Sequence, residues 1–391
     1  MIELRGTTWD HPRGWGGVRA AADAFESIHP EVRVRWDVRS LQAFADQPVE
    51  QLAEGSDLIV LDYPAIGEAV ARGALLPLDE QLDAGLLEEQ ATSSVGRSYE
   101  SYAWDGHQWA LAIDAAAQVA AYRPDLLERA GVPLPRTWDD VRLLTDALRT
   151  RGPSIAMPAI PVDAVCAFLG TCRALGAEPF GAGEGVVVAR DVGREALGLL
   201  RDVVAHCDPR SLGWNPPTAL QVMASTDEVA YLPLAFLYAS FGRAGVAPHV
   251  LRFAAGPIGA AGLPSGTLGG AGLAVSASSP HPLEACAYAA FTASADVQRG
   301  AYARGGGQPG HRAAWTDREV NASTGGAFAA TLDALDVAYL RPRDDGFIRF
   351  QDAAGHLVHA HLRDGGDVDE VLDAVDASYR SSLGSRAEAG R

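Results

Sequence analysis

Residues 56–64 read SDLIVLDYP, and this stretch decides the class of fold that the sequence predicts. Four consecutive apolar residues, 58–61, lie between Asp57 and the polar pair Asp62 and Tyr63. A continuous apolar run of this length is typical of a central parallel strand that is buried on both faces. Open α/β sheets bind ligands at the carboxyl ends of such strands, so Asp62 and Tyr63 are candidate ligand contacts. Capping of the next helix explains Asp62 equally well.

The residues before this strand predict a βαβ opening. Residues 2–8 suit a strand, residues 18–28 have the apolar spacing of a helix, and residues 29–38 alternate as a second strand does. A helix and a turn follow the 56–64 strand. The repeated alternation of strands and helices predicts an α/β protein.

Downstream, residues 107–131 predict an apolar strand and then a helix that begins near Pro124 and ends at Gly131. The next helix has a clear start signal, because Thr137 can cap it and Asp140 stands three residues later, as in a capping box. We expect Gly152 to end that helix.

Size and composition narrow the range of functions. A chain of 391 residues exceeds what one hydrophobic core usually fills, which predicts two domains. The net charge of −18 repels phosphate backbones and anionic membrane surfaces, so nucleic acid is not an expected partner. All 32 basic residues are arginine, which excludes Schiff-base catalysis by lysine. Four scattered cysteines predict free thiols rather than a disulfide framework.

Common catalytic and metal-binding motifs do not fit this chain. GGGQPG at 305–310 matches GxGxxG formally, but it follows a helical segment and contains a proline, so we do not expect a dinucleotide site. HLVHAH at 356–361 places only two of its three histidines on one helical face, and no metal or other cofactor is expected. The sequence has no GxSxG elbow, HExxH motif or Walker loop.

The segment TTWDHPRGW, residues 7–15, carries unusual chemistry for the end of a first strand. We interpret it as a loop at the rim of a ligand site, with Trp9 as an apolar platform, Asp10 and His11 as polar contacts, and Arg13 as a fork for a carboxylate or phosphate. The alternative is a strand end whose tryptophans pack in the core and whose charged groups are solvated.

Three segments together resemble the type 1 extracellular solute-binding proteins of ABC importers, the group that includes maltose-binding and other carbohydrate-binding proteins. Residues 56–82 resemble the family's strand, ligand loop and L-PLD passage. Residues 109–141, with YRPDLLERAG and the PRTWDD sequence, are similar to its first hinge strand and the helices after it. Residues 268–315 resemble its returning hinge strand, a helix of the first lobe and a glycine-rich crossing.

The resemblance implies a two-lobed periplasmic-binding-protein-like (type II) α/β fold whose discontinuous lobes hold a ligand in the cleft between them and close by hinge bending. Lobe one would comprise residues 1–113 and 268–308, and lobe two residues 114–267 and 309–391.

Further candidate ligand residues follow from this assignment. Asp114 and Gln118 stand beside the first hinge crossing, Gly270 stands in the returning strand and Gln308 in the crossover loop. The candidate residues on the opposing face of the cleft are Trp214, Asn215, Tyr231 and Tyr238. The candidate anion-binding group is Arg341. Each has a structural alternative, such as core packing of the aromatic rings, a buried hydrogen bond for Asp114, or surface solvation of the arginine.

The expected function is capture of a small polar solute, either sugar-like or carboxylate-bearing, by a monomer that would deliver it to an ABC permease if the protein is exported. The alternative is a cytoplasmic enzyme on the same scaffold, such as a lyase, isomerase or cyclase, with Asp10, His11 and Asp62 in acid and base roles. The N-terminus shows no signal peptide and no segment is apolar enough to insert in a membrane, which predicts a cytoplasmic location. Removal of a leader would instead leave a periplasmic or cell-surface protein.

Overall fold

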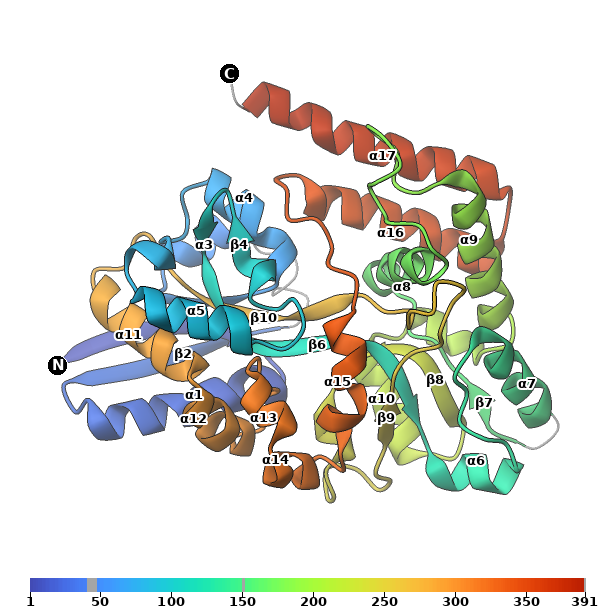
Figure 1. Ribbon diagram of the computed structural model, residues 1–391, viewed down its shortest axis with the longest axis horizontal. Helices are drawn as coiled ribbons and strands as arrows, with labels where there is room; N and C mark the ends of the chain where they lie inside the picture. Colours follow the sequence, from blue (N-terminus) through green and yellow to red (C-terminus); the bar gives the residue numbers. More distant parts are fainter. Residues whose placement is uncertain (41–47, 150–151, 390–391) are drawn as a thin grey trace. The chain divides into compact units, whose positions relative to one another are not determined.

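The computed structural model describes residues 1–40, 48–149 and 152–389, which fold into two compact units (Figure 1). Unit 1 comprises Met1–Ala116, Gly269–Ala322 and Arg341–Asp345. Unit 2 comprises Ala117–Leu268, Ser323–Leu340 and Gly346–Arg391. Residues 309–322 and Arg341–Asp345 pack with unit 1, whereas the expected lobe two included all of residues 309–391.

Unit 1 is built on strands β1 (Ile2–Trp9), β2 (Val32–Arg39), β3 (Leu58–Leu61), β10 (Leu268–Val275) and the first part of β6 (Ala110–Tyr122). They lie in the order β2-β1-β3-β10-β6. β1 is parallel to both of its neighbours, and β10 is antiparallel to β3. All four residues of β3 are buried, which confirms the buried central strand predicted from the apolar run; its pairing is parallel with β1 but antiparallel with β10.

Helices and one hairpin complete unit 1. The longer helices are α1 (Pro12–Ile28), α5 (Ala84–Ser93) and α11 (Pro282–Ala293). The shorter elements are α3 (Val49–Ala53), η1 (Tyr63–Ala65), α4 (Ile66–Ala71), η2 (Leu78–Glu80), η3 (Glu100–Tyr102), α12 (Ala295–Val297), the π-helical η6 (Gln298–Tyr302), α13 (Arg312–Thr316), α14 (Arg318–Ser323) and the hairpin of β4 (Ala103–Trp104) and β5 (His107–Gln108). Phe25 of α1 meets Tyr288 of α11 edge to face, with ring centroids 5.4 Å apart, so these two helices share one core.

The predicted loop at residues 7–15 is not a loop. β1 continues to Trp9, and α1 begins at Pro12 after only two linking residues. His11 caps this helix, since its Nδ1 accepts a hydrogen bond from the backbone N–H of Arg13 at 3.1 Å. Proline in the first turn of α1 fits this start, because its ring is already set at the φ of a helix.

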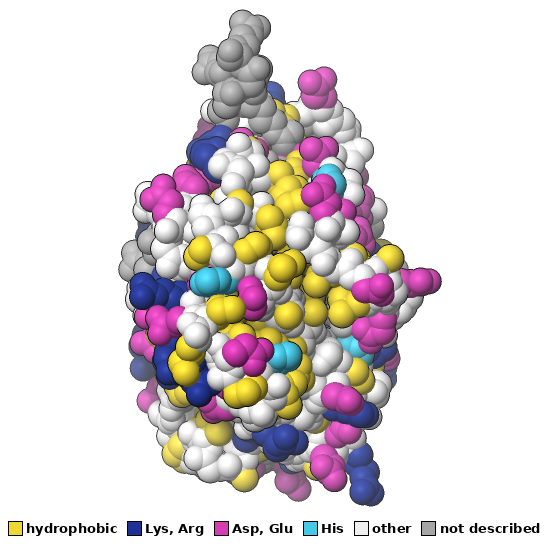
Figure 2. All heavy atoms as spheres, turned by 90° about the vertical axis from the view of Figure 1, so that its left-hand side faces the viewer, with side chains coloured by type: hydrophobic (Ala, Val, Ile, Leu, Met, Phe, Trp, Pro, Cys, Tyr) yellow, Lys and Arg dark blue, Asp and Glu magenta, His cyan; other side chains and the backbone are white. Residues whose placement is uncertain are grey.

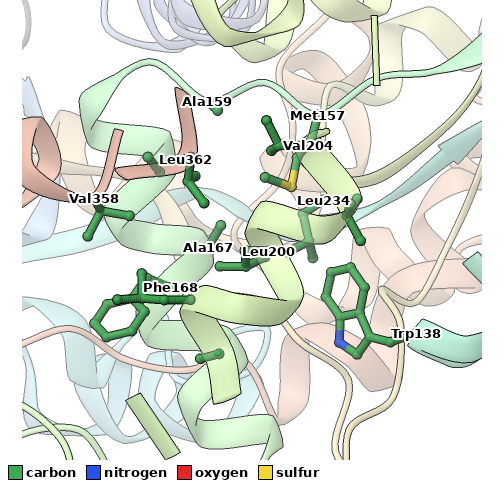
Figure 3. Packing of buried hydrophobic residues seen from close by; sticks show 14 of the residues in the cluster. Trp138, Met157, Ala159, Ala167, Phe168, Leu200, Val204, Leu234, Val358 and Leu362 are labelled. Atoms are coloured by element: carbon green, nitrogen blue, oxygen red, sulfur yellow. The ribbon is translucent and has the colours of Figure 1, made fainter. Parts of the chain in front are cut away.

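In unit 2 the second part of β6 pairs with β8 (Val229–Phe236) and β9 (Arg252–Ala254), and β8 pairs with β7 (Ser154–Ile155). The helices are α6 (Pro124–Ala130), α7 (Trp138–Leu148), α8 (Pro161–Ala174), α9 (Arg190–Val204), α10 (Pro216–Ser225), α15 (Ala327–Asp336), α16 (Phe347–Asp364) and α17 (Val368–Ala389). Two short 3₁₀ turns complete the unit: η4 (Pro209–Gly213) lies between α9 and α10, and η5 (Ala239–Gly242) lies between β8 and β9. Figure 3 shows the buried side chains of α8, α9 and α16, among them Phe168, Leu200 and Val358, packed in one cluster.

The predicted helix signals in this unit are confirmed at two boundaries and wrong at a third. Gly131 closes α6 in a left-handed conformation with φ of 70°, and Thr137 and Asp140 form the expected capping box of α7. Gly152 does not end α7, because that helix stops at Leu148.

The surface carries both signs of charge. On the face shown in Figure 2, acidic side chains and arginines are scattered among hydrophobic and polar groups rather than gathered into one patch. All four cysteines are buried and free, as the sequence predicted. No helix in the described part of the chain is long and apolar enough to cross a membrane.

Candidate functional site

Polar side chains gather in unit 1 where β1 and β3 end. Trp9, the last residue of β1, is only 5% exposed. It packs in the core, as in the alternative interpretation of this segment, and is not an exposed platform for a ligand. Asp10 is exposed, and its backbone N–H donates to the carbonyl of Arg39 at 2.6 Å. Burial and the neighbouring guanidinium of Arg13 lower the pKa of His11 to about 4, while Asp10 opposes the shift. His11 is therefore a neutral helix cap at pH 7.

Arg13 turns inward rather than toward solvent. Its Nε donates to Oδ2 of Asp114 at 2.8 Å, and its Nη2 donates to Oδ1 of the same carboxylate. The two side chains are 7% and 0% exposed, so this is a buried, two-pronged ion pair between α1 and β6. Loss of hydration raises the pKa of Asp114, and the Arg13 guanidinium opposes that rise. The Arg13 guanidinium, which was predicted to bind a ligand carboxylate or phosphate, thus pairs with a carboxylate of the protein instead.

A second charged group follows β3. Asp62 occupies the capping position of η1, but its side chain makes no capping hydrogen bond. Its Oδ2 lies 3.4 Å from Nη2 of Arg341, whereas its Oδ1 is buried and has no hydrogen-bond partner among the described residues. The Asp62 side chain keeps 41% of its surface exposed, so a small molecule can reach it. This arrangement favours the ligand-contact interpretation of Asp62 over the capping one.

Tyr63 holds Arg341 in place. The Tyr63 hydroxyl accepts hydrogen bonds from the backbone N–H of Arg341 at 3.2 Å and from its Nε at 3.0 Å. The guanidinium carbon of Arg341 also lies 4.8 Å from the centroid of the Tyr63 ring, a cation–π contact. Both side chains are almost fully buried, and burial raises the pKa of Tyr63 to about 12. Tyr63 is therefore a neutral support for Arg341.

The two charged groups influence each other. Loss of hydration raises the pKa of Asp62, and the positive charges of Arg341 and Arg13 both oppose the rise. The charge of Asp62 in turn raises the pKa of Asp114. Two carboxylates and two guanidinium groups thus form one electrostatic cluster at the carboxyl ends of β1 and β3, with one buried carboxylate oxygen still unsatisfied.

Gly270 and Gln308 have structural roles in unit 1. Gly270 has φ of 122°, and a Cβ there would lie 2.4 Å from the carbonyl oxygen of Asp114, so only glycine fits beside this stretch of β6. Gln308 is buried, and its Nε2 donates to the carbonyl of Ala115 at 2.8 Å. Both residues fix the backbone around Asp114.

The candidate residues of unit 2 have mixed environments. Gln118 is 2% exposed; its Nε2 donates to the Asp163 carbonyl at 3.3 Å, while its Oε1 has no partner among the described residues. Asn215 caps α10 by accepting from the Thr218 N–H at 3.0 Å. Trp214 is half-buried, with the guanidinium carbon of Arg210 5.3 Å from its ring centroid.

Tyr231 and Tyr238 are both buried. The Tyr231 ring belongs to the hydrophobic core, which agrees with the alternative of core packing for these aromatic rings. Its hydroxyl has no hydrogen-bond partner in the described part of the chain.

Two residues without a sequence signal, Tyr102 and Asp163, are buried beside the candidate residues Tyr63 and Gln118. Tyr102 is buried edge to face against Tyr63, with ring centroids 6.4 Å apart, and so supports the Arg341 contact indirectly. Asp163 stands in the first turn of α8 and is 3% exposed. Tyr102 and Tyr63 are far apart in the sequence, so no local motif marks their contact. Within the described residues, no group of three or more histidine, cysteine, aspartate or glutamate side chains is placed to hold a metal ion.

Several solved structures share this fold. The maltose-bound MalE3 of T. maritima superposes with a TM-score of 0.80 at 20% identity, covering 97% of this chain and 100% of that one. The GacH receptor of Streptomyces glaucescens gives a TM-score of 0.79 at 19% identity over 98% and 99% of the two chains. An ABC transporter solute-binding protein of Thermotoga lettingae with bound α-D-tagatose gives 0.82 at 16% identity over 98% and 100%. At these identities the likeness establishes the fold alone.

The sequence itself carries a family match. Residues 16–299 match the model of a family described as "Bacterial extracellular solute-binding protein". This match spans more than half of the chain. The matched region contains β3 with Asp62 at its end and β6 with Asp114. The chain therefore belongs to the bacterial extracellular solute-binding protein family.

Proposed function

We propose that this protein captures a neutral, hydroxyl-rich solute, a sugar or a polyol, and presents it to an ABC permease outside the cell membrane. The observation that carries the solute class is Asp62, an accessible carboxylate with an unsatisfied buried oxygen beside a fixed guanidinium. We assign the solute contacts in unit 1 to Asp62 and Arg341.

The chemistry of this group suits vicinal hydroxyls. A carboxylate oxygen accepts a hydrogen bond from one hydroxyl, and a guanidinium donates to the oxygen of the next. Hydrogen bonds to charged groups are the stronger ones, which makes such a pair selective for a polyhydroxylated ligand.

The charge balance argues against a carboxylate-bearing solute. Arg13 already pairs with Asp114, and Arg341 lies beside Asp62, so each guanidinium has a carboxylate of the protein next to it. An added anion would meet the field of Asp62 without an uncompensated positive charge to offset it. A neutral solute avoids this cost.

The structural relatives bind molecules of the proposed class. Maltose, α-D-tagatose, ribitol and D-mannitol are bound in four of the related solute-binding proteins. The family is extracellular and supplies solutes to importers, which is the basis for proposing a permease partner and a periplasmic or cell-surface location.

Calorimetric titration with maltose, ribitol, D-mannitol and D-tagatose tests the proposal. At least one of these should bind the wild-type protein, and Asp62→Asn should weaken that binding by roughly tenfold or more, since a hydrogen bond to a charged group contributes about 1.5–3 kcal/mol. Glu31→Gln is the matched control, because Glu31 is exposed and precedes β2, at the opposite edge of the parallel strands. Failure of all four solutes would reject the proposed solute class, and equal affinity of wild type and Asp62→Asn would reject the site.

A further inference from the structure

Unit 2 contains a pocket that no part of the proposed solute site explains. It has a volume of about 810 Å³ and lies among α9, η4 and the C-terminal end of α16. Pockets that bind small molecules commonly measure about 300–1,000 Å³, so this one is large enough for a ligand. None of the candidate solute contacts lines it.

The charged side chains in the pocket wall differ in whether they have an ion-pair partner. Arg194 is paired with Asp369 through two hydrogen bonds of 2.8 Å, Arg363 is paired with Asp364, and the carboxylate of Asp202 accepts from Arg142 at 2.9 Å. Arg201 also lines the pocket and is exposed, but it has no ion pair or side-chain hydrogen bond among the described residues. One uncompensated guanidinium therefore faces the pocket.

The guanidinium of Arg201 lies close to the backbone at Gly365. Gly365 follows α16 with φ of 80°, and a Cβ at that position would lie 2.2 Å from Nη2 of Arg201. Any other side chain would occupy the space that the guanidinium takes. The guanidinium thus lies beside the end of α16, although the residue as a whole is exposed.

A second polar group of the wall is unsatisfied. His361 lines the pocket and is only 4% exposed, and its Nδ1 has no hydrogen-bond partner in the described part of the chain. A buried polar atom without a partner costs free energy unless a ligand or water satisfies it. Burial and the charge of Arg201 lower the pKa of His361, while a backbone hydrogen bond with Gly365 opposes the shift, so its ring is neutral at pH 7. In the tautomer that carries its proton on Nδ1, the ring has one hydrogen bond to donate from that atom.

The remaining wall is mostly apolar. Val204, Leu212, Leu362 and Val368 line the pocket. Val204 and Leu362 are also part of the buried cluster in Figure 3, so the floor of the pocket is the edge of the unit's core. A ligand that satisfied the polar groups alone would leave this apolar surface uncovered.

We propose that this pocket is a second binding site, for a small organic anion with a carboxylate or phosphate group on an apolar body. The anionic group pairs with Arg201 and accepts a hydrogen bond from His361, and the apolar body covers the leucine and valine side chains. Because every lining residue belongs to unit 2, the site does not depend on the proposed solute contacts of Asp62 and Arg341.

Titrations of the full chain with phenyl phosphate and with benzoate, followed by calorimetry, test this site, with benzyl alcohol as the neutral comparison. We expect at least one of the two anions to bind at millimolar concentrations and benzyl alcohol to bind more weakly. Arg201→Gln should weaken anion binding by roughly tenfold or more, as expected for loss of a charged hydrogen-bond partner. Arg201→Lys keeps the charge and should retain part of the affinity.

Two control variants make the result specific. Arg149→Gln removes an exposed arginine of unit 2 outside the pocket and should leave binding unchanged. Asp62→Asn should also leave it unchanged, which separates this site from the solute site. The proposal is overturned if neither anion binds the wild-type protein, if benzyl alcohol binds as well as the anions, or if a folded Arg201→Gln variant binds them like wild type. Thermal melting followed by circular dichroism establishes that each variant is folded.

Discussion

Arg13 and Asp114 form an ion pair inside unit 1, with 7% and 0% of their side chains exposed. Removing one partner leaves the other charge buried and uncompensated, which costs about 3–5 kcal/mol. We predict that Asp114→Asn lowers the free energy of unfolding by that order, measured by urea denaturation.

Two further variants test whether the loss of stability comes from the buried charge. Arg5→Gln breaks a pair with Glu3 in which both side chains are more than half exposed, and it should change stability by about 1 kcal/mol or less. The double variant Arg13→Met, Asp114→Leu removes both charges and should recover much of the loss. A single Asp114→Asn variant as stable as wild type would contradict the account of a buried pair.

His11 predicts a stability change with pH. Its pKa falls from 6.5 to about 4 in the folded protein, so between these values the unfolded chain binds the proton more readily. Stability should therefore decrease as pH falls from 6.5 to 4, by about 3 kcal/mol in total from this residue.

The raised pKa values of Asp62 and Asp114 act in the opposite direction, so the His11 contribution must be isolated by difference. His11→Asn keeps a good helix cap and removes the titrating ring. The difference in unfolding free energy between wild type and His11→Asn should follow the predicted pH window, and a pH-independent difference would refute it.

The role of a residue was predictable where the neighbouring sequence indicates its position in the fold. Asp62 stands out because it follows a buried apolar run, and the end of such a strand is a binding edge. Its pairing with Arg341 was not predictable, because the two residues are 279 positions apart. Arg13 and Asp114 are 101 positions apart, so the pattern that offered Arg13 to a ligand contained no sign of its carboxylate partner.

At the scale of elements, α1 packs against the backbone of the glycine-rich segment after η6. A Cβ at Gly16 would lie 2.1 Å from the carbonyl oxygen of Gly305, which a side chain cannot avoid by moving. We predict that Gly16→Ala destabilises the protein by about 1–3 kcal/mol, measured by thermal or urea denaturation.

Gly198 of α9 is the matched control, since it too is helical but a Cβ there meets nothing within 4 Å. Gly198→Ala should raise stability by about 0.5–1 kcal/mol, because alanine is the better helix former. If both substitutions changed stability in the same direction, packing at Gly16 would not be the cause.

Helix boundaries were predictable where the capping residues are the common ones. Thr137 with Asp140 gives the start of α7, and Gly131 gives the end of α6. The start of α1 was missed because its cap is His11, which is not among the preferred capping residues, and because the charged and aromatic residues around it read as a loop.

At the scale of the whole molecule, the sequence predicted a discontinuous first lobe but not all of its segments. Residues 341–345 join unit 1 through contacts that leave no local pattern. The Gly67 N–H donates to the carbonyl of Arg343 at 2.9 Å, and Nε of Arg343 donates to the carbonyl of Ala103 at 3.0 Å. Such contacts form only after the chain has folded, which is why a boundary drawn from sequence alone placed this segment elsewhere.

The connections between the two units predict a closing motion. The chain passes from one unit to the other at residues 116–117, 268–269, 322–323, 340–341 and 345–346, and binding proteins built from two linked units close on their ligand by rotation at a few residues of this kind. We predict that a saturating concentration of the sugar or polyol that binds lowers the radius of gyration measured by small-angle X-ray scattering. Asp62→Asn at the same solute concentration should show a smaller change, because less of it is bound. Superimposable scattering curves for solute-free and solute-saturated wild type would show that capture does not involve closure.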